Sequence, residues 1–449
     1  MTRQIKAAVR LGAVLAATAF VACPVLADEF PEVGEQVPIT ILINASPWFS
    51  GYEAAVALYS EQTGNEIDLD VTPYSGMLEK ARNAVRGAES THQLLNIDAA
   101  WLVEFYESDT LTPLKQIDPD FSLPEQVFQC GQTHWWNAAK RWRTAEGGTI
   151  FGVPPNCNTH MQVYRKDVYD KAGLTPPATV DDVLASCKAI QKATDLYGYV
   201  TRGERGSIRF EFSPYLAAYG GNIAADMENG DYTVTINSPE ALAALDKFIE
   251  IIRDCGPENV AALTQNDVIQ LMQTGKAAEI QVVVAAMSSL TDPAKSVVAG
   301  KLGAVPNPRA GDTKLPSPLG NWVSVIPQNI SAEEKQAALA FLKWFVSKPA
   351  QEAYAEAGGV PVRADVLEAL KGDPDYFWID GYLANLQDAF SPYGYAEAAE
   401  VDNVLGLRLN QALIGEITTT AALNTAAREI ETIFQRTGRK TGRLPDLPE

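Results

Sequence analysis

"ITILINASPWFSGYEAAVALYSEQTGNEIDLDV" spans residues 39–71 and carries the clearest information about the fold class. Its first five residues are apolar or β-branched, which is typical of a buried strand, and residues 66–71 alternate acidic and apolar side chains, as in a half-buried strand. We expect a helix between them, over residues 52–63. A helix over 76–87 and a strand over 94–98 continue the series. Alternating strands and helices predict right-handed crossovers and a parallel sheet in an α/β fold.

A second series of strands and helices follows. Strands are expected over residues 160–165, 197–201 and 279–284. Two helix starts carry the capping-box pattern, at Thr179 and at Ser331, because an acidic residue follows three positions later in each case. A chain of this length exceeds what one hydrophobic core usually supports, so we expect two lobes.

The amino terminus has the pattern of a signal peptide over residues 1–27. Basic residues precede an apolar run over 11–21, and small residues stand at 25–27. The run is too short for a membrane-spanning helix. A lipoprotein site at Cys23 is an alternative, but we prefer cleavage after Ala27. We therefore expect export to the periplasm.

The acidic balance of the chain limits its partners. The formal net charge is −20, and no later stretch is apolar over the length of a membrane span. Nucleic acid and anionic membranes require clustered lysine and arginine, so neither is expected as the main partner. Self-repulsion of such a chain favours a monomer in solution.

Four cysteines follow the signal peptide, and they allow three disulfide pairings. Cys187 and Cys255 each lie on the apolar face of an expected helix. A Cys187–Cys255 bridge is therefore plausible, with two buried free thiols as the alternative. The cysteines lack close spacing and the histidines are isolated, so we expect no metal site and no cofactor.

Each amino-terminal strand is followed by an aromatic residue. Trp48 follows the first strand, Tyr74 the second, and Asp98 with Trp101 the third. In open α/β sheets, ligands bind beyond the carboxyl ends of the strands. Aromatic faces pack on the C–H face of a carbohydrate or polyol, and carboxylates grip its hydroxyls. Core packing is the competing interpretation for each ring, but three such loops at one edge favour a binding site.

Four longer stretches resemble the family-1 extracellular solute-binding proteins, the maltose-binding-protein-like, sugar-capturing subunits of ABC importers. The resemblance covers nearly all of residues 38–367. The stretches are "LLNIDAAWLVEFYESDTLTPL" (94–114), "IFGVPPNCNTHMQVYRKDVYDKAGLTPPAT" (150–179), "FLKWFVSKPAQEAYAEAGGVPVRADVL" (341–367) and the Gly-Asn-Trp of 320–322.

This resemblance implies a two-lobed periplasmic binding protein fold, type II-like, with a ligand cleft between lobes joined by hinge strands. It places residues 28–152 and 305–350 in lobe 1. Residues 153–304 and 351–449 then form lobe 2.

The resemblance also implies ligand contacts beyond the aromatic loops. They are Asn156 and Asn158 after the first crossing, Asn321 and Trp322 of Gly-Asn-Trp, Arg363, and Arg205, Glu211 and Tyr215 in the second lobe. For Arg205 and Glu211 the alternative is a solvated surface, and for Tyr215 it is the core. The segment 285–289 departs from the family, because many relatives have an aromatic residue there.

The function that these features favour is capture of a sugar, oligosaccharide or polyol and its delivery to ABC permease subunits in the membrane. A binding protein for a peptide or polyamine is one alternative. An exported glycan-acting enzyme is another, since Glu211 near Asp98 would make a carboxylate pair. Against the enzyme, the three histidines and the serine stretches form no nucleophile-activating motif.

Overall fold

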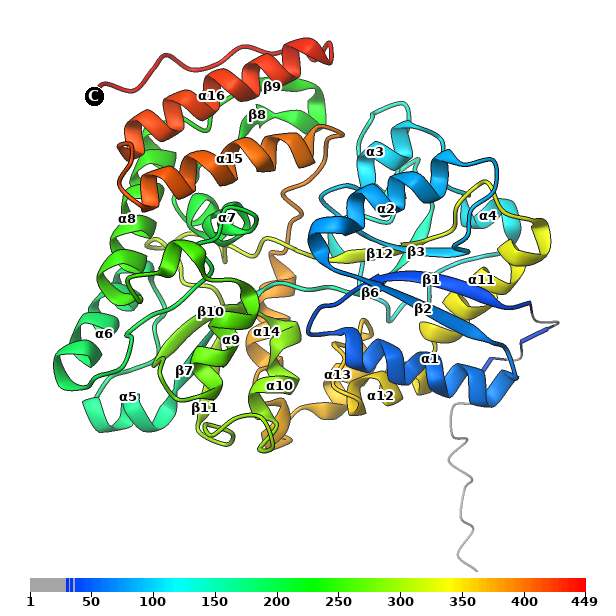
Figure 1. Cartoon of the computed structure of the whole chain (residues 1–449), viewed down its shortest axis with the longest axis horizontal. Coiled ribbons are helices and arrows are strands. Elements are labelled where there is room, and N and C mark those ends of the chain that lie inside the picture. The colour runs from blue at the N-terminus through cyan, green and yellow to red at the C-terminus, as the bar shows by residue number, and fades with distance from the viewer. Residues whose placement is uncertain (1–29, 32, 35–36) are drawn as a thin grey trace, which may run out of the picture.

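The chain folds into two α/β lobes joined by several crossing segments, as a computed structural model shows for residues 30–31, 33–34 and 37–449 (Figure 1). Lobe 1 lies on the right of Figure 1 and lobe 2 on the left. The expected signal peptide over residues 1–27 lies outside the described residues. The two-lobed α/β fold predicted from the sequence is confirmed.

The sheet of lobe 1 has the strand order β2-β1-β3-β12-β6. β1, β2 and β3 run parallel, whereas β12 is antiparallel to both β3 and β6. The bounds are β1 (Ile39–Asn44), β2 (Ile67–Thr72), β3 (Leu94–Asp98), β6 (Gly152–Asn156) and β12 (Trp322–Val325), with the small pair β4 (Trp135–Trp136) and β5 (Thr149–Ile150) alongside. The predicted parallel pairing of the first three strands is therefore present.

The helices of lobe 1 cover this sheet and form an aromatic core. Tyr52 and Tyr59 of the first helix pack against Phe341, with ring centroids 6.0 and 5.1 Å away. The bounds are α1 (Phe49–Thr63), α2 (Tyr74–Arg86), α3 (Leu102–Glu107), α4 (Leu114–Ile117), α11 (Ala332–Phe345), α12 (Lys348–Glu356) and α13 (Ala364–Leu370).

The lobe boundary expected at residue 350 falls inside α12 and is wrong. α12 packs against α1 and α11, and the Tyr354 ring lies 5.3 Å from that of Phe345. The turn after α12 passes so close to α1 that a Cβ at Gly51 would lie 2.5 Å from the backbone nitrogen of Gly359. α12 and α13 therefore belong to lobe 1, because their apolar faces complete its core.

Lobe 2 contains an antiparallel sheet of order β10-β7-β11 and a separate β8-β9 pair. Residues 197–201 make only isolated bridges to the segment around β10, at Tyr197 and Val200, instead of the full strand expected there. The bounds are β7 (His160–Arg165), β8 (Ala224–Asp226), β9 (Asp231–Val234), β10 (Glu279–Val283) and β11 (Leu302–Val305).

The two helix starts predicted from the capping-box pattern are confirmed. Thr179 and Ser331, the latter in lobe 1, both form the expected capping boxes. A Cys187–Cys255 disulfide joins the buried faces of two helices of lobe 2. The bounds of the helices in this lobe are α5 (Lys166–Ala172), α6 (Val180–Ala193), α7 (Ile208–Ala218), α8 (Pro239–Cys255), α9 (Gln265–Gln273), α10 (Met287–Thr291), α14 (Ile379–Gln387), α15 (Ala398–Leu413) and α16 (Thr419–Arg436).

The segments that cross between the lobes are hydrogen-bonded to one another. β6 leads directly into β7 through residues 157–159, and the return from β11 to β12 takes residues 306–321, so lobe 1 resumes later than the expected residue 305. The Leu319 N–H donates to Phe390 O (2.8 Å), and the Gly320 N–H donates to Asn158 O (2.9 Å). A second disulfide, Cys130–Cys157, ties lobe 1 to the first crossing.

Candidate functional site

Three strand ends of lobe 1 meet at the edge of the sheet that faces lobe 2. Trp322, the first residue of β12, pairs in register with Asp98 at the end of β3 and with Asn156 at the end of β6. The antiparallel direction of β12 places its start beside the carboxyl ends of its neighbours. Residues distant in sequence are thereby brought side by side at this edge.

Four aromatic rings gather around this edge. The Trp322 ring centroid lies 6.0 Å from that of Trp48, 6.1 Å from Tyr74 and 6.1 Å from Trp101. Tyr74 and Trp101 are 4.9 Å apart. We call these four residues the aromatic cluster; the structure brings together every aromatic residue that the strand ends of lobe 1 were expected to supply.

The rings of the aromatic cluster differ in exposure. Tyr74 is 45% exposed, whereas Trp48, Trp101 and Trp322 are each buried. The end of β1 and the loop after it also hold buried polar atoms without a hydrogen-bond partner, at Asn44 Oδ1 and Trp48 Nε1. Tyr74 therefore presents the accessible face; Trp101 and Trp322 pack against it, and Trp48 packs against Trp322.

Asp98 is a buried carboxyl group beside this cluster. It accepts hydrogen bonds from the Ala100 N–H (2.9 Å) and the Tyr74 hydroxyl (3.3 Å). The pKa of Asp98 is raised to about 7: burial and, to a smaller extent, Asp402 of lobe 2 raise it, while the hydrogen bond from Ala100 and the charge of Arg202 lower it. Because residues of lobe 2 act on this pKa, Asp98 lies where the two lobes approach each other.

Buried amides line the crossing segments next to Trp322. Asn156 Oδ1 accepts from the Trp322 N–H (3.3 Å), and Asn158 Oδ1 accepts from the Ala285 N–H (3.2 Å). Asn321 Nδ2 donates to Thr133 Oγ1 (2.7 Å). Asn156 Nδ2 and Asn321 Oδ1 have no partner, which leaves one donor and one acceptor beside the cluster.

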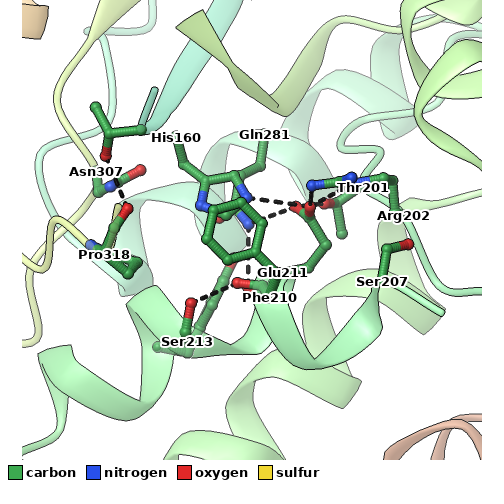
Figure 2. A network of polar contacts seen from close by, with 12 residues as sticks. His160, Thr201, Arg202, Ser207, Phe210, Glu211, Ser213, Gln281, Asn307 and Pro318 are labelled. Carbon is green, nitrogen blue, oxygen red and sulfur yellow. Dashed lines mark hydrogen bonds and ion pairs between the residues drawn. The ribbon is translucent and has the colours of Figure 1, made fainter. Parts of the chain in front are cut away.

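Lobe 2 contributes a closed polar network centred on Glu211 of α7 (Figure 2). Its carboxylate accepts from Thr201 Oγ1 (2.6 Å) and Gln281 Nε2 (2.8 Å), contacts His160 Nε2 (3.0 Å) and pairs with Arg202. Burial alone would raise the pKa of Glu211, but Arg202 and His160 outweigh it and hold the pKa below its usual range. The carboxylate is therefore ionised and satisfied within the protein.

Three residues predicted as contacts lie elsewhere. Tyr215 is in the core of lobe 2, where its hydroxyl donates to the Tyr199 hydroxyl (3.0 Å). Arg363 lies in lobe 1, and its guanidinium group donates hydrogen bonds to the Asp365 carboxylate and to Val346 O. Arg205 is exposed, in the loop before α7 that packs against Gly406 of α15. None of the three forms a contact with the aromatic cluster.

Several residues near the site were missed by the sequence reasoning. Phe210 stacks near His160 (4.1 Å between centroids), and a Cβ at Gly320 would lie 2.5 Å from the Phe210 ring, so only glycine allows this close approach. Asp402 of α15 pairs with Arg209 (2.9 Å). Phe210 lies in α7 and Asp402 in α15, and neither helix has a sequence motif that indicates a binding residue. Both residues come near the site only through the packing of the two lobes against each other.

Two other kinds of feature were searched for in the described part of the chain. There, no helix has the length and apolar character needed to cross a bilayer. Nor does any group of three or more His, Cys, Asp or Glu side chains in that part have an arrangement able to hold a metal ion.

Comparison with known proteins agrees with this geometry. The sequence profile of bacterial extracellular solute-binding proteins matches residues 54–377. The chain belongs to this family. The match includes the aromatic cluster except Trp48, the Glu211 network and the crossing segments up to α13.

Individual relatives are distant in sequence but alike in fold. The erythritol/L-threitol-binding protein of Mycolicibacterium smegmatis is 22% identical over 350 residues, covering 74% of this chain and 71% of that one. The maltose-bound protein MalE3 of T. maritima has a TM-score of 0.76 at 24% identity, covering 89% and 100% of the two chains. A ribitol-bound solute-binding protein of Agrobacterium radiobacter has a TM-score of 0.77 at 21% identity, covering 89% and 99%.

Proposed function

We propose that this protein is the periplasmic substrate-binding subunit of an ABC transporter and captures a sugar or polyol between its lobes. The observation that carries the proposal is the aromatic cluster beside Asp98, at the edge of lobe 1 that approaches Arg202 and Asp402 of lobe 2. Ligands named for its relatives, erythritol or L-threitol, ribitol and maltose, support the ligand class.

The proposed ligand contacts divide by chemistry. The exposed Tyr74 face takes the C–H side of the ligand, as aromatic rings do with apolar surfaces. Asp98 and the amides of Asn156 and Asn321 hydrogen-bond the hydroxyls, because each buried hydroxyl left unpaired would cost about 1–3 kcal/mol. The buried indoles of the cluster fix the position of the Tyr74 ring.

A short ligand fits best. The segment after β10 contains Val284, Ala285 and Ala286, all buried, so it offers no ring for a second sugar unit. In lobe 2, the Phe210 ring is partly exposed and lies against Gly320 of the crossing segment. We therefore favour a monosaccharide or a linear alditol over a long oligosaccharide.

In the proposed mechanism the ligand gates closure of the lobes. It bridges Asp98 of lobe 1 and the charged groups of lobe 2, and thereby shifts the population toward a closed form. The crossing segments at residues 157–159 and 306–321 absorb the movement. The closed, monomeric protein then delivers its ligand to the permease, and no covalent bond is made or broken.

One alternative has a specific observation in its favour. Asp98 and Asp402 put two carboxyl groups near each other, which suits the amino groups of a peptide or polyamine. Arg209 pairs with Asp402, however, and Arg202 pairs with Glu211, so the local charge is largely balanced. We prefer the uncharged ligand for this reason.

Isothermal titration calorimetry with erythritol, ribitol, mannitol, monosaccharides and maltose tests the proposal. Saturable binding of at least one of these with a stoichiometry of one is expected, with no response to polyamines or short peptides. Binding of amines alone would replace the proposal by the alternative. Release of reducing ends from oligosaccharides would instead reveal a glycan-acting enzyme.

A further inference from the structure

A cavity of about 150 Å³ lies where the two lobes meet, and no residue of the aromatic cluster lines it. Lobe 1 contributes Trp142 and Arg143, and lobe 2 contributes one face of α7 together with Leu405 of α15. Residues 390–392, in the segment that leads to α15, also line the cavity, as do residues 221–224, Met227 and Ile236. None of the residues predicted to bind the transported ligand lines this cavity.

Helix α7 separates the cavity from the polar network of lobe 2. Arg209, Phe212 and Leu216 line the cavity, and their spacing of three and four residues places them on one face of the helix. Glu211 and Tyr215 follow the same spacing on another face, where Glu211 joins the network of Figure 2 and Tyr215 contacts Tyr199. The cavity and the polar network therefore lie on different faces of one helix.

The cavity walls are mainly apolar and enclose the volume of one ring. Phe212, Leu216 and Leu405 are buried, and Phe390, an exposed large apolar residue at 38% exposure, also lines the cavity. A cavity of this volume with apolar walls accommodates a benzene ring.

One positive charge in this wall has no ionic partner. Arg143 is 8% exposed and donates to Ser391 Oγ (2.7 Å) and to the Ser391 carbonyl oxygen, and its guanidinium group stacks over Trp142 (5.1 Å). Within the described residues it forms no ion pair. Arg209 is already neutralised by Asp402.

The other charges around the cavity do not compensate Arg143. Glu228, which precedes β9, is exposed and too far away for an ion pair with Arg143. A buried and unpaired guanidinium group is unfavourable, and a carboxylate is the partner that its geometry fits best. Arg143 donates two hydrogen bonds to uncharged oxygens of Ser391, and its remaining N–H groups are free to donate to such a carboxylate.

We propose that this cavity binds a small monocarboxylate with an apolar, ring-sized body, whose carboxylate pairs with Arg143. The ring fills the space between Phe212, Leu216 and Phe390. A polyol should bind here more weakly than such a carboxylate, because the apolar part of the wall offers its hydroxyls no partners.

Calorimetry with benzoate, benzyl alcohol and acetate as probes tests this proposal on the purified protein. Benzoate shares the ring with benzyl alcohol and the charge with acetate, so it should bind at least about tenfold more tightly than either. Equal binding of benzyl alcohol would overturn the role of Arg143. Absence of benzoate binding in the millimolar range would overturn the site.

Variants locate the bound benzoate. Arg143→Gln should weaken benzoate binding by about tenfold or more. Ala217→Phe places a ring in the cavity wall without touching Arg143, and should abolish benzoate binding while the response to the transported polyol or sugar persists. Ala225→Phe is the matched control, because Ala225 is exposed and outside the cavity lining.

A third variant excludes the aromatic cluster as the benzoate site. Trp322→Phe should leave benzoate affinity unchanged. If Trp322→Phe removes benzoate binding and Ala217→Phe does not, benzoate occupies the site between Asp98 and lobe 2, and the proposal is wrong. Ala217→Phe and the comparison with benzyl alcohol remain decisive even if Arg143→Gln does not fold.

Discussion

Lobe 1 and lobe 2 approach the proposed ligand with opposite kinds of surface. Lobe 1 offers the aromatic cluster, in which rings support one exposed ring and Asp98 stands beside them. Lobe 2 offers the Glu211 network, in which both carboxylate oxygens of Glu211 are already paired. We propose that the first surface contacts the ligand and that the second holds Arg202 and the helix α7 in place.

The sheet geometry explains this difference. In lobe 1 the parallel strands end at one edge, so the loops after β1, β2 and β3 supply the side chains. In lobe 2 the neighbouring strands β7 and β10 are antiparallel, and polar residues inside the strands, His160 and Gln281, reach Glu211. The side chains from the loops of lobe 1 can therefore face a ligand, whereas the side chains from the strands of lobe 2 bond to one another and stabilise that lobe.

The largest effect is expected for Glu211→Gln. Loss of the carboxylate leaves Arg202 and the buried His160 without their charged partner, and removing one member of a buried pair costs about 3–5 kcal/mol in unfolding free energy. Urea unfolding measures the loss. Glu258→Gln is the matched control, since Glu258 is exposed in the same lobe and should change stability by less than about 0.5 kcal/mol. A Glu211→Gln variant as stable as this control would remove the structural role of the network.

Removing each disulfide in turn tests whether it contributes to the stability of a lobe or to the movement between the lobes. Cys187–Cys255 spans 68 residues and Cys130–Cys157 spans 27. Constraint of the unfolded chain predicts a loss of about 3–4 kcal/mol for each pair of alanine substitutions, larger for Cys187–Cys255 by about 1 kcal/mol.

Ligand affinity should distinguish the two disulfide variants further. Only the Cys130–Cys157 variant should alter affinity, because Cys157 lies in the first crossing between the lobes. Paired measurements of unfolding and of ligand affinity check both parts. Altered affinity in the Cys187–Cys255 variant alone would contradict the assignment of the hinge.

Trp322→Phe tests the ligand surface of lobe 1 directly. The smaller ring withdraws support from Tyr74 and Trp101, so ligand affinity should fall by about 1–3 kcal/mol. Trp344→Phe is the control, because Trp344 is equally buried in lobe 1 but packs on Tyr59, away from Asp98. Calorimetry measures the ligand affinity of both variants. Equal affinity in the two would show that the aromatic cluster does not contribute to ligand binding.

The lobe 1 site could be predicted largely from sequence because its residues follow strands. Trp48, Tyr74 and Trp101 each come shortly after a strand of recognisable pattern, and parallel strands bring their ends together. Trp322 required the family resemblance, since no periodicity shows that β12 inserts between β3 and β6. The order of strands in a sheet depends on contacts between segments far apart in the chain, and the hydrophobic pattern of one segment does not reveal it.

The lobe 2 site was predicted less well for a physical reason. Glu211 was expected to contact ligand, yet its oxygens are satisfied by partners far apart in sequence, including Gln281, 70 residues away. Asp402 acts on Asp98 only because α15 folds back to the junction of the lobes. The boundary at residue 350 failed similarly, since the packing of α12 on α1 is not visible in either helix alone.

The comparison that sets the two lobes most closely side by side concerns two buried acids. Burial raises the pKa of Asp98 in lobe 1 to about 7 and that of Glu279 in the core of lobe 2 to about 7. Between its unfolded pKa near 4 and pH 7, each group binds a proton in the folded state and loses it on unfolding. Each therefore lowers stability as the pH rises through this window.

Asp98→Asn should remove this penalty, which is about 1.4 kcal/mol for each unit by which the pKa is raised, so that the variant gains a few kcal/mol of stability relative to the wild type at pH 8 and almost nothing at pH 4. Glu279→Gln should show the same pH dependence in urea unfolding. The two differ in function: Asp98 lies beside Tyr74 at the junction of the lobes, whereas Glu279 is bonded to Tyr169 and Gln162 inside lobe 2. Ligand affinity should therefore fall in Asp98→Asn and stay unchanged in Glu279→Gln, and a loss in both would show that burial of an acid, rather than its place at the junction, governs binding.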